Sequence, residues 1–587
     1  MSAPSALVAE FAPATEQQWE ALVRAKAKDP EAPLLTALED GISTKWLYTA
    51  ADALGSDPGG VPGAAPFVRG ARGAYPWAIR QLCDASQPRE ANAQILEELE
   101  GGASEVLLIC GPAPRTVDEL DEVLAGVYLD MAPVALHGAR DPEPLLDLWR
   151  RRGHDPAEIR GSLRLDPIGR GAPDEVDGAV AIAARVHDEF PHVQALAVDT
   201  SPYVDAGAGV RDELALALST AIAYLRAAAE HDIDPATTAQ LLEFTLIAGP
   251  DQFLEIAKLR AFRRLWAQVL EHCGVVPEQR RSRVYARTSR RMVSSLDPWV
   301  NILRETIAAF AAGVGGADGV TVLPFDEPVG ETTGLGGPLA RRIARNTQLV
   351  LTEEASLHRV IDPAGGSWYV ESLTDELARA GWAAMQEIEA AGGIAHALAS
   401  GEVEARLAAR TADRHAALAR RRREMTGVNI WPLLGDDGLE RVPGVALEAT
   451  SQAGARDAAQ FEALRDRARR LGTPKLLLAS VGPLASHVNA NLWAKSFFES
   501  GGIETVPSGV DPDIAALVAE HGAVAAAVCC GRDGDPGPAV AALREAGVRH
   551  IYAVGADAGG AERVRDGVDM VALLGTLLDR YEQEARR

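Results

Sequence analysis

The chain has 587 residues, of which 47% are hydrophobic and 24% are charged, and its formal net charge is −25. That length is too great for one ordinary core, so it predicts two or three domains. The acidic balance argues against nucleic-acid and membrane-surface binding, and without an 18-residue apolar run or a signal-peptide pattern we expect a cytoplasmic protein without membrane spans.

The first 45 residues are predicted to form an arm. Thr15 and Gln18 have the spacing of a capping box, and Trp19 and Leu22 follow on one face, which predicts a capped amphipathic helix. This helix could pack on a partner or fold back on its own chain. Glycine and proline crowd residues 55–66, which indicates a loop before the main domain.

Residues 46–430 are predicted to form one large α/β domain, in which short apolar strands alternate with longer helical patterns. The predicted strands are Glu105–Cys110, Val134–His137, Gln194–Val198, Val284–Ala286 and Gly319–Leu323. The predicted helices are Asp212–Glu230, Pro235–Ala248, Phe253–His272, Val300–Ala312 and Ala340–Thr352. Such alternation favours a (β/α)8 TIM-type barrel, with a doubly wound sheet as its main rival.

A second, smaller domain is predicted at residues 474–587, after a linker at residues 431–473. Lys475–Val481 starts a new strand–helix pattern, which continues through Ala523–Cys529 and His550–Val554. The order of these elements predicts a flavodoxin-like α/β domain.

The cysteines predict neither a metal site nor a disulfide framework, because none of their spacings fits either. They are Cys83, Cys110, Cys273, Cys529 and Cys530. The last two follow an apolar run, so we expect them to pack in a core.

The segment Arg341–Leu377 is the most specific motif of the chain. Its residues predict a helix, a turn at Asp362-Pro363-Ala364-Gly365-Gly366 and, after an aromatic pair, a second helix. The strings R-I-A-R-N-T-Q-L-x-L-x-x-E and D-P-x-G-G-S-x-Y-V-E within it closely resemble the methylmalonyl-CoA mutase family. Tyr75–Gln81 and Phe253–Ala261 resemble two further segments of that family.

This resemblance implies an activity and a cofactor. The family interconverts (R)-methylmalonyl-CoA and succinyl-CoA by a radical rearrangement that uses adenosylcobalamin, and the cofactor supplies the difficult chemistry. Its heterodimeric members pair a large catalytic chain with a shorter homologue. The resemblance also implies the order arm, barrel, linker and cobalamin-binding-type domain.

The cobalamin loop is the first test of which chain this is. The family places D-x-H-x-x-G after the first strand of its last domain, where the His reaches cobalt and the Asp holds the other ring nitrogen. If His487 takes the ligand position, Ala485 replaces the Asp and Ala490 replaces the Gly. The loop is degenerate in that register.

A second register of the same loop gives the same answer. If Gly482 anchors the alignment, Leu484 replaces the Asp and Ser486 replaces the His. Ser480 stands where the catalytic chain of the family has Lys. We therefore expect no cobalamin-binding residue and no metal ligand in this chain.

The barrel is the second test. The family's S-I-S-I-S-G-Y-H-M-Q-E-A-G-A segment, with its active-site His, corresponds here to residues 195–208, where Pro202 or Tyr203 takes the His position. His192 precedes the strand, where we expect a surface residue. In the catalytic chain small Ser residues admit the pantetheine arm of CoA; here we expect the barrel to be filled by apolar residues, namely Leu196, Val198, Val134 and Leu136.

Two further segments of the barrel also depart from the family. R-T-H-x-Q-T-S-G-W corresponds here to Val284–Met292, which lacks the His, Gln, Gly and Trp. The Tyr-bearing turn before the first strand is shortened, and Tyr75 is its nearest remaining residue. We therefore expect no catalytic residue in this chain.

Three hypotheses follow. The leading one is the small, non-catalytic subunit of a heterodimeric mutase, stabilising a homologous large subunit that binds adenosylcobalamin and acyl-CoA substrate. The alternative is a catalytically competent acyl-CoA mutase with a divergent active site that uses His487 and Tyr75. A third is a separate CoA-binding or regulatory protein, against which a filled barrel would argue.

Overall fold

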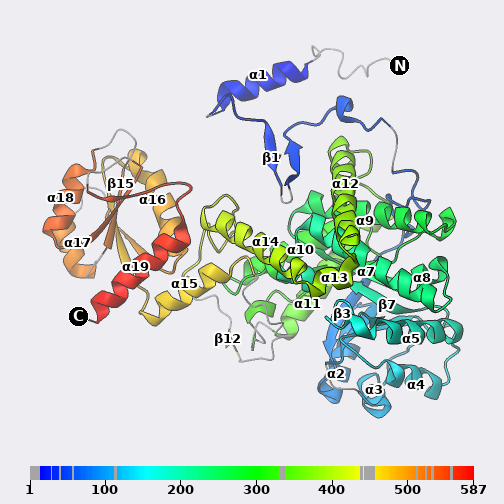
Figure 1. The fold of residues 1–587 in the computed structure, drawn as a ribbon. Coiled ribbons are helices and arrows are strands. Elements are labelled where there is room, and N and C mark those ends of the chain that lie inside the picture. Colours follow the sequence, from blue (N-terminus) through cyan, green and yellow to red (C-terminus); the bar gives the residue numbers. More distant parts are fainter. Residues whose placement is uncertain are drawn as a thin grey trace.

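Three parts follow one another along the chain (Figure 1). They are an arm with a short helix, a barrel surrounded by helices, and a smaller sheet domain that lies to one side of the barrel. The structure, a computed structural model, describes residues 14–27, 29–38, 41–55, 59–111, 115–329, 332–333, 337–435, 440–441, 456–509, 513–521, 525–530, 535–555 and 560–586.

Eight parallel strands form a closed barrel in the order β10-β3-β4-β5-β6-β7-β8-β9. The strands are β3 (Ala78–Asp84), β4 (Glu105–Ile109), β5 (Val134–His137), β6 (Gly161–Leu165), β7 (Val193–Asp199), β8 (Leu242–Ala248), β9 (Val284–Thr288) and β10 (Gly319–Thr321). Closure confirms the TIM-type barrel and excludes its doubly wound rival, because an open sheet has two edge strands.

Five of the strands coincide with those predicted from the sequence, whereas β3, β6 and β8 were not predicted. The predicted helix Pro235–Ala248 is wrong in its second half, because α8 (Pro235–Leu241) ends where β8 begins. The apolar run there fits both a buried helix and a buried strand by periodicity. Tertiary pairing with β7 and β9 decides for the strand.

Helices surround the barrel and bury its outer face. They are α2 (Pro88–Glu100), α3 (Val117–Val123), α4 (Glu143–Arg151), α5 (Val176–Glu189), α6 (Ser201–Ala206), α7 (Val210–Glu230), α8, α9 (Gln252–His272), α10 (Trp299–Val314), α11 (Pro338–Leu349), α12 (Trp368–Ala390), α13 (Gly393–Ala399) and α14 (Glu402–Ala419). The main core lies between these helices and the outward side chains of the strands.

The apolar residues expected inside the barrel lie in this outer core instead. Val134, Leu136, Leu196 and Val198 are all buried in the cluster that the helices share. Side chains alternate along a strand, so these positions face the helices and their neighbours face the barrel axis. The expectation of apolar barrel filling by these four residues is therefore wrong, and polar residues take that place.

The Arg341–Leu377 motif forms α11, a π-turn at Val350–Glu354, the Asp362 turn and the start of α12. Asp362 has a left-handed backbone (φ 51°). Its carboxylate accepts hydrogen bonds from Arg69 (3.0 Å) and from Arg260 of α9. The turn at Asp362 thus connects the segment before the barrel to α9 and leads into α12. The contacts of this turn stabilise the fold.

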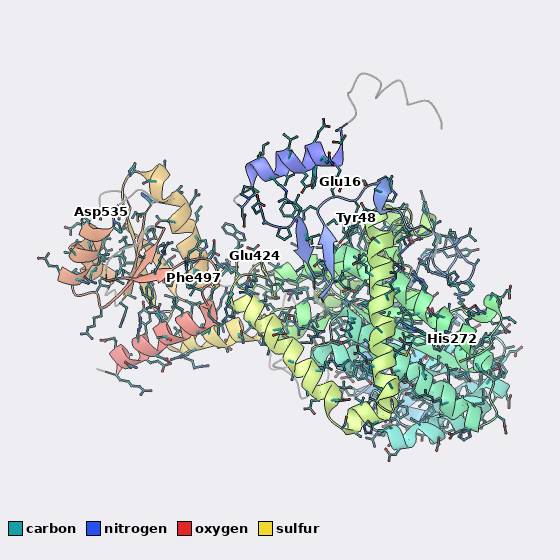
Figure 2. The ribbon with its side chains drawn as sticks, turned by 45° about the horizontal axis from the view of Figure 1, so that its top comes forward. Glu16, Tyr48, His272, Glu424, Phe497 and Asp535 are labelled. Atoms are coloured by element: carbon teal, nitrogen blue, oxygen red, sulfur yellow. The ribbon has the colours of Figure 1, made fainter. Side chains whose placement is uncertain are left out.

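The arm carries α1 (Glu16–Lys26), and the predicted capping box of Thr15 and Gln18 is present. No residue of α1 is buried, and Leu22 is 66% exposed. A hairpin of β1 (Leu35–Ala37) and β2 (Ser43–Lys45) follows. Beyond it, the Tyr48 ring lies 5.1 Å from the Tyr369 ring of α12, centroid to centroid, which fixes the arm to the barrel (Figure 2).

The last domain is a five-stranded parallel sheet in the order β14-β13-β15-β16-β17. Its strands are β13 (Lys475–Ser480), β14 (Glu504–Pro507), β15 (Ala525–Cys529), β16 (His550–Val554) and β17 (Glu562–Val564). Its helices are α16 (Leu484–Glu499), α17 (Ile514–His521), α18 (Gly537–Glu545) and α19 (Met570–Ala585). Alternate strand residues enter two cores, one on each face of the sheet.

Helix α15 (Ala459–Arg470), within the segment predicted as a linker, packs into a core of this last domain. It also reaches the barrel side, since Glu462 accepts a hydrogen bond from the backbone of Ser295 at 2.8 Å. Cys529 and Cys530 are buried in the domain, as predicted, and both are free thiols.

Candidate functional site

The carboxyl ends of the barrel strands enclose a cavity, at the face where TIM-barrel enzymes place their active sites. Its volume of about 20 Å³ has room for one or two water molecules. Its wall combines charged side chains, among them Arg80, Arg164, Asp199 and Arg287, with apolar ones such as Leu107. The origin of these side chains explains why so little space is left.

Arg80 of β3 lies at the bottom of the barrel and binds two carboxylates. Its Nη1 and Nη2 donate to the two oxygens of Glu243 at 2.7 and 3.2 Å, and its Nε donates to Glu105 at 2.9 Å. Its guanidinium carbon lies 3.3 Å from the ring centroid of Tyr285, whose hydroxyl donates to Glu105 at 3.0 Å. Charge pairs and ring contacts therefore fill this layer.

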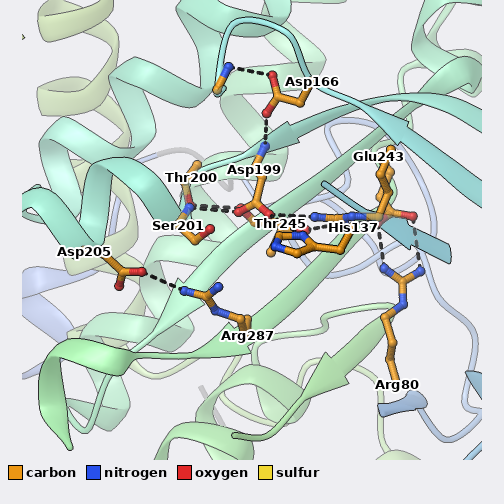
Figure 3. Close-up of polar contacts among 12 residues, drawn as sticks. Arg80, His137, Asp166, Asp199, Thr200, Ser201, Asp205, Glu243, Thr245 and Arg287 are labelled. Atoms are coloured by element: carbon orange, nitrogen blue, oxygen red, sulfur yellow. Dashed lines mark hydrogen bonds and ion pairs between the residues drawn. The ribbon is translucent and has the colours of Figure 1, made fainter. Parts of the chain in front are cut away.

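Arg164 of β6 continues the network toward the mouth, where it reaches Glu243, Thr245 and Asp199, three residues that Figure 3 labels. It donates to Glu243, to the Thr245 hydroxyl at 2.8 Å and to Asp199 at 2.7 Å. The register of β6 against β7 shifts between Ser162 and Leu165, and Arg164 has a φ of 50°. This bulge aims the long side chain at the barrel axis.

Two arginines and a histidine lie at the mouth. Arg287 donates to Asp205 at 3.1 Å, and the Arg290 Nε lies 2.9 Å from a carboxylate oxygen of Glu327. The His137 Nδ1 lies 3.9 Å from the Asp199 carboxylate. The mouth is therefore crossed by ion pairs that join strands β5, β7 and β9 to the loops beyond them.

The carboxylates of the network stay ionised. Burial alone would raise the pKa of Glu243, but Arg80 and Arg164 outweigh burial and lower this pKa to about 2. Against the same opposing effect of burial, Arg164 and Arg287 hold the pKa of Asp199 well below its usual range. Burial raises the pKa of the Tyr285 phenol. The barrel thus contains fixed ion pairs with a neutral tyrosine.

The arginines and carboxylates of this arrangement are paired with one another, and the cavity beside them measures about 20 Å³. Over the described ranges, no three His, Cys, Asp or Glu side chains come together as metal ligands. In the same part of the chain, no helix is long and apolar enough to cross a bilayer.

The barrel residues singled out from the sequence lie away from the cavity. Pro202 is exposed and Tyr203 is buried against the main core, both in α6. His192 is exposed before β7, and Tyr75 is 73% exposed before β3. None of these four residues lines the cavity.

The degenerate cobalamin loop lies at the carboxyl end of β13. His487 is in the first turns of α16 and is 2% exposed, and its Nδ1 donates to the Gly482 carbonyl oxygen at 3.1 Å. Leu484 and Ala485 are exposed, and Ala490 is half-buried. The Ser480 hydroxyl accepts a hydrogen bond from Asn491 at 3.0 Å. These residues lie together where strand β13 ends and helix α16 begins.

Sequence reasoning missed the residues that fill the barrel. Arg80, Arg164 and Glu243 lie on the three strands that were not predicted. The signal was one charged residue flanked by apolar residues in a short segment, as in Leu241-Leu242-Glu243-Phe244. On a strand buried on both faces, such a residue must find a partner across the barrel.

Comparison with protein families gives one match, to the model described as methylmalonyl-CoA mutase. It covers residues 37–150 and 109–470, and so includes β2, the whole barrel and α15.

Comparison with curated proteins finds relatives along nearly the whole chain. A methylmalonyl-CoA mutase small subunit of Streptomyces virginiae is 43% identical over 98% of both chains. A methylmalonyl-CoA mutase small subunit of Propionibacterium freudenreichii subsp. shermanii is 35% identical over 98% of this chain and 96% of its own. A methylmalonyl-CoA mutase large subunit of Streptomyces virginiae is 29% identical over 72% of this chain and 63% of its own.

Proposed function

The chain belongs to the methylmalonyl-CoA mutase family, and we propose that within it this protein is the small, non-catalytic subunit of a heterodimeric mutase. The complex interconverts (R)-methylmalonyl-CoA and succinyl-CoA in the cytoplasm. A homologous large subunit binds adenosylcobalamin and the acyl-CoA substrate, and this chain stabilises it.

The observation that carries this proposal is the filled barrel. Arg80, Arg164 and Glu243 hold one another across the axis, where a substrate arm would have to pass. The remaining space has room for one or two water molecules. Opening the barrel would separate buried charges from their partners, which costs several kcal/mol.

The residues of the last domain do not fit adenosylcobalamin. A cobalt ligand needs an accessible ring nitrogen, and His487 is buried in α16. Ala485 offers no carboxylate to hold such a ring. The strand order of the domain is that of flavodoxin-like folds, which supports a cobalamin-binding-type domain that has lost its ligand.

The relatives' names support a partner of the same family, because small and large subunits both resemble this chain. We propose residues 1–45 as an arm that contacts this partner, residues 46–430 as the barrel, 431–473 as a linker and 474–587 as the last domain. Trp19 and Leu22 are available for that contact, since α1 buries no residue in its own chain.

The alternative, a competent mutase with a divergent site, finds less support. It requires His487 and Tyr75 to act on one substrate. Tyr75 lies on the surface before the barrel, whereas His487 is enclosed in the last domain. A separate CoA-binding protein is disfavoured by the filled barrel.

The test is mutase activity of the purified chain, alone and after mixing with a homologous large subunit from the same genome. We expect no turnover of methylmalonyl-CoA by the isolated chain with added adenosylcobalamin, and turnover by the mixture. Activity of the isolated chain would sink the proposal and favour the divergent site.

A further inference from the structure

A second pocket lies outside the barrel, between the segment before β3, the end of α10 and the turn at Asp362. Its charged side chains are Arg69, Arg72, Arg263 and Asp362, and His358 also lines it. The cavity volume of this pocket is about 20 Å³. The pocket opens to the surface, since Val360 in its wall is 62% exposed. The proposed function uses no part of this pocket.

Arg72 lacks partners for its buried guanidinium atoms. Its Nε and Nη1 are buried, and neither atom has a hydrogen-bond partner among the described residues. Burial lowers the pKa of Arg72, an effect that Asp318 only partly offsets. Asp318 is itself 3.2 Å from Arg281. A buried guanidinium without acceptors is costly unless another group supplies them.

Arg263 adds a second cation without a carboxylate in hydrogen-bond contact. Its three nitrogens donate only to backbone carbonyls, among them Phe67 (2.9 Å), Val68 (2.9 Å) and Gly315 (2.7 Å). Burial lowers its pKa to about 10. The Nδ1 of His358 is buried and also has no partner in the described part of the chain.

The pocket therefore has more positive than negative charge. Asp362 is the one carboxylate among its lining residues, and it is already bound to Arg69 and to Arg260. Asp318 acts on Arg72, and Asp362 and Asp318 act on Arg263, but these two carboxylates do not offset the effect of burial, which lowers the pKa of both arginines. Oxygen atoms of an anion would supply both acceptors and charge.

We propose that this pocket binds a phosphate group, with one or two of its oxygens on Arg72 and His358 and the rest in the open mouth. The depth of the pocket suits one or two oxygen atoms, and the mouth leaves space for an ester substituent. The site goes beyond the proposed function, because it lies on this chain and outside both the barrel interior and the degenerate cobalamin loop.

The experiment is equilibrium dialysis of the full chain with radiolabelled inorganic phosphate at fixed ionic strength in potassium chloride. We expect saturable binding that falls about tenfold or more in Arg72→Gln, because a charged hydrogen bond is lost. Arg342→Gln removes the same charge from an exposed position on α11 and should bind like wild type. A second variant, His358→Ala, should also weaken phosphate binding. It tests the site independently if Arg72→Gln does not fold.

Phenyl phosphate distinguishes the source of the phosphate group. Competition by this monoester would assign the pocket to the phosphate of a larger molecule, and lack of competition would assign it to free phosphate; either supports the site. Equal binding by wild type and a folded Arg72→Gln, or no saturable binding by wild type, would overturn it.

Discussion

Glu243 is the residue on which the barrel interior depends, since it accepts hydrogen bonds from both Arg80 and Arg164. Without its carboxylate, two buried guanidinium groups would face each other. The ion pairs therefore hold one another in place and fill the barrel axis. Buried ion pairs of this kind add little net stability, and their main effect is to specify one arrangement of the interior.

Replacing Glu243 tests this dependence. We expect Glu243→Gln to lower the free energy of unfolding by about 3 kcal/mol, because Arg80 keeps only Glu105 and Arg164 keeps only Asp199 as a buried carboxylate partner. Urea denaturation followed by circular dichroism measures the change. Glu189→Gln, which breaks a half-exposed pair with Arg150, is the control and should cost at most about 1 kcal/mol. Equal effects would show that the interior charges are not coupled.

Acid stability tests the ionisation of the same residue. The pKa of Glu243 is about 2 in the fold and has an ordinary value of 4.5, so its contribution is full above pH 4.5 and is lost as pH falls toward 2. We expect wild type to lose up to about 3 kcal/mol from this group across that window. Glu243→Gln should lack that part of the slope. Parallel curves for the two proteins, measured by denaturation at each pH, would contradict the assignment.

At the scale of elements, helices and strands that are marked by neighbouring residues in the sequence could be predicted. Five barrel strands, the capped helix α1 and the helix pair of the Asp362 motif were predicted from apolar periodicity, caps and turn residues. The strands β3, β6 and β8 were not, because each carries a charge whose partner lies far away in the sequence. Arg80 and Glu243, for example, are 163 residues apart.

The candidate site follows the same rule. The replacement of the family's His at residues 202–203 is predicted from local sequence alone and stays a prediction. The residues that fill the barrel interior could not be predicted from the sequence, because their contacts depend on which strands face each other across the barrel. The expected apolar filling by Leu196 and Val198 failed for that reason: alternation places them outside, and Ala197 and Asp199 inside.

Helix α1 carries the element-scale prediction. We expect Trp19→Ser with Leu22→Ser to lower the free energy of unfolding by at most about 1 kcal/mol, because Leu22 is exposed and Trp19 is half-buried. The same double variant should weaken binding to the large subunit by about tenfold or more, as loss of an apolar anchor does. Surface plasmon resonance measures the affinity.

The opposite face of α1 supplies the control for this experiment. Gln17 and Ala21 are exposed on that face. The double variant Gln17→Ser with Ala21→Ser should keep wild-type affinity. If both double variants bind the partner like wild type, the arm has another role.

At the scale of the whole molecule, the chain belongs to its family by sequence and has a closed eight-stranded barrel, and the proposed function assigns the chemistry to a partner chain. The fold consists of the barrel, the Asp362 turn that binds Arg260, and the five-stranded domain. Ion pairs occupy the barrel axis, and His487 is buried in α16. Under the proposed function, this chain contributes a folded surface and stability to its partner. The central claim is therefore that only one chain of the complex binds cobalamin.

The most direct measurement is the amount of cobalamin bound by the purified heterodimer, read from its visible absorption after removal of free cofactor. We predict one cobalamin per heterodimer, unchanged by His487→Ala in this chain and lost when the D-x-H-x-x-G histidine of the large subunit is replaced. Two cobalamins per heterodimer, or loss of cofactor on changing His487, would contradict the account.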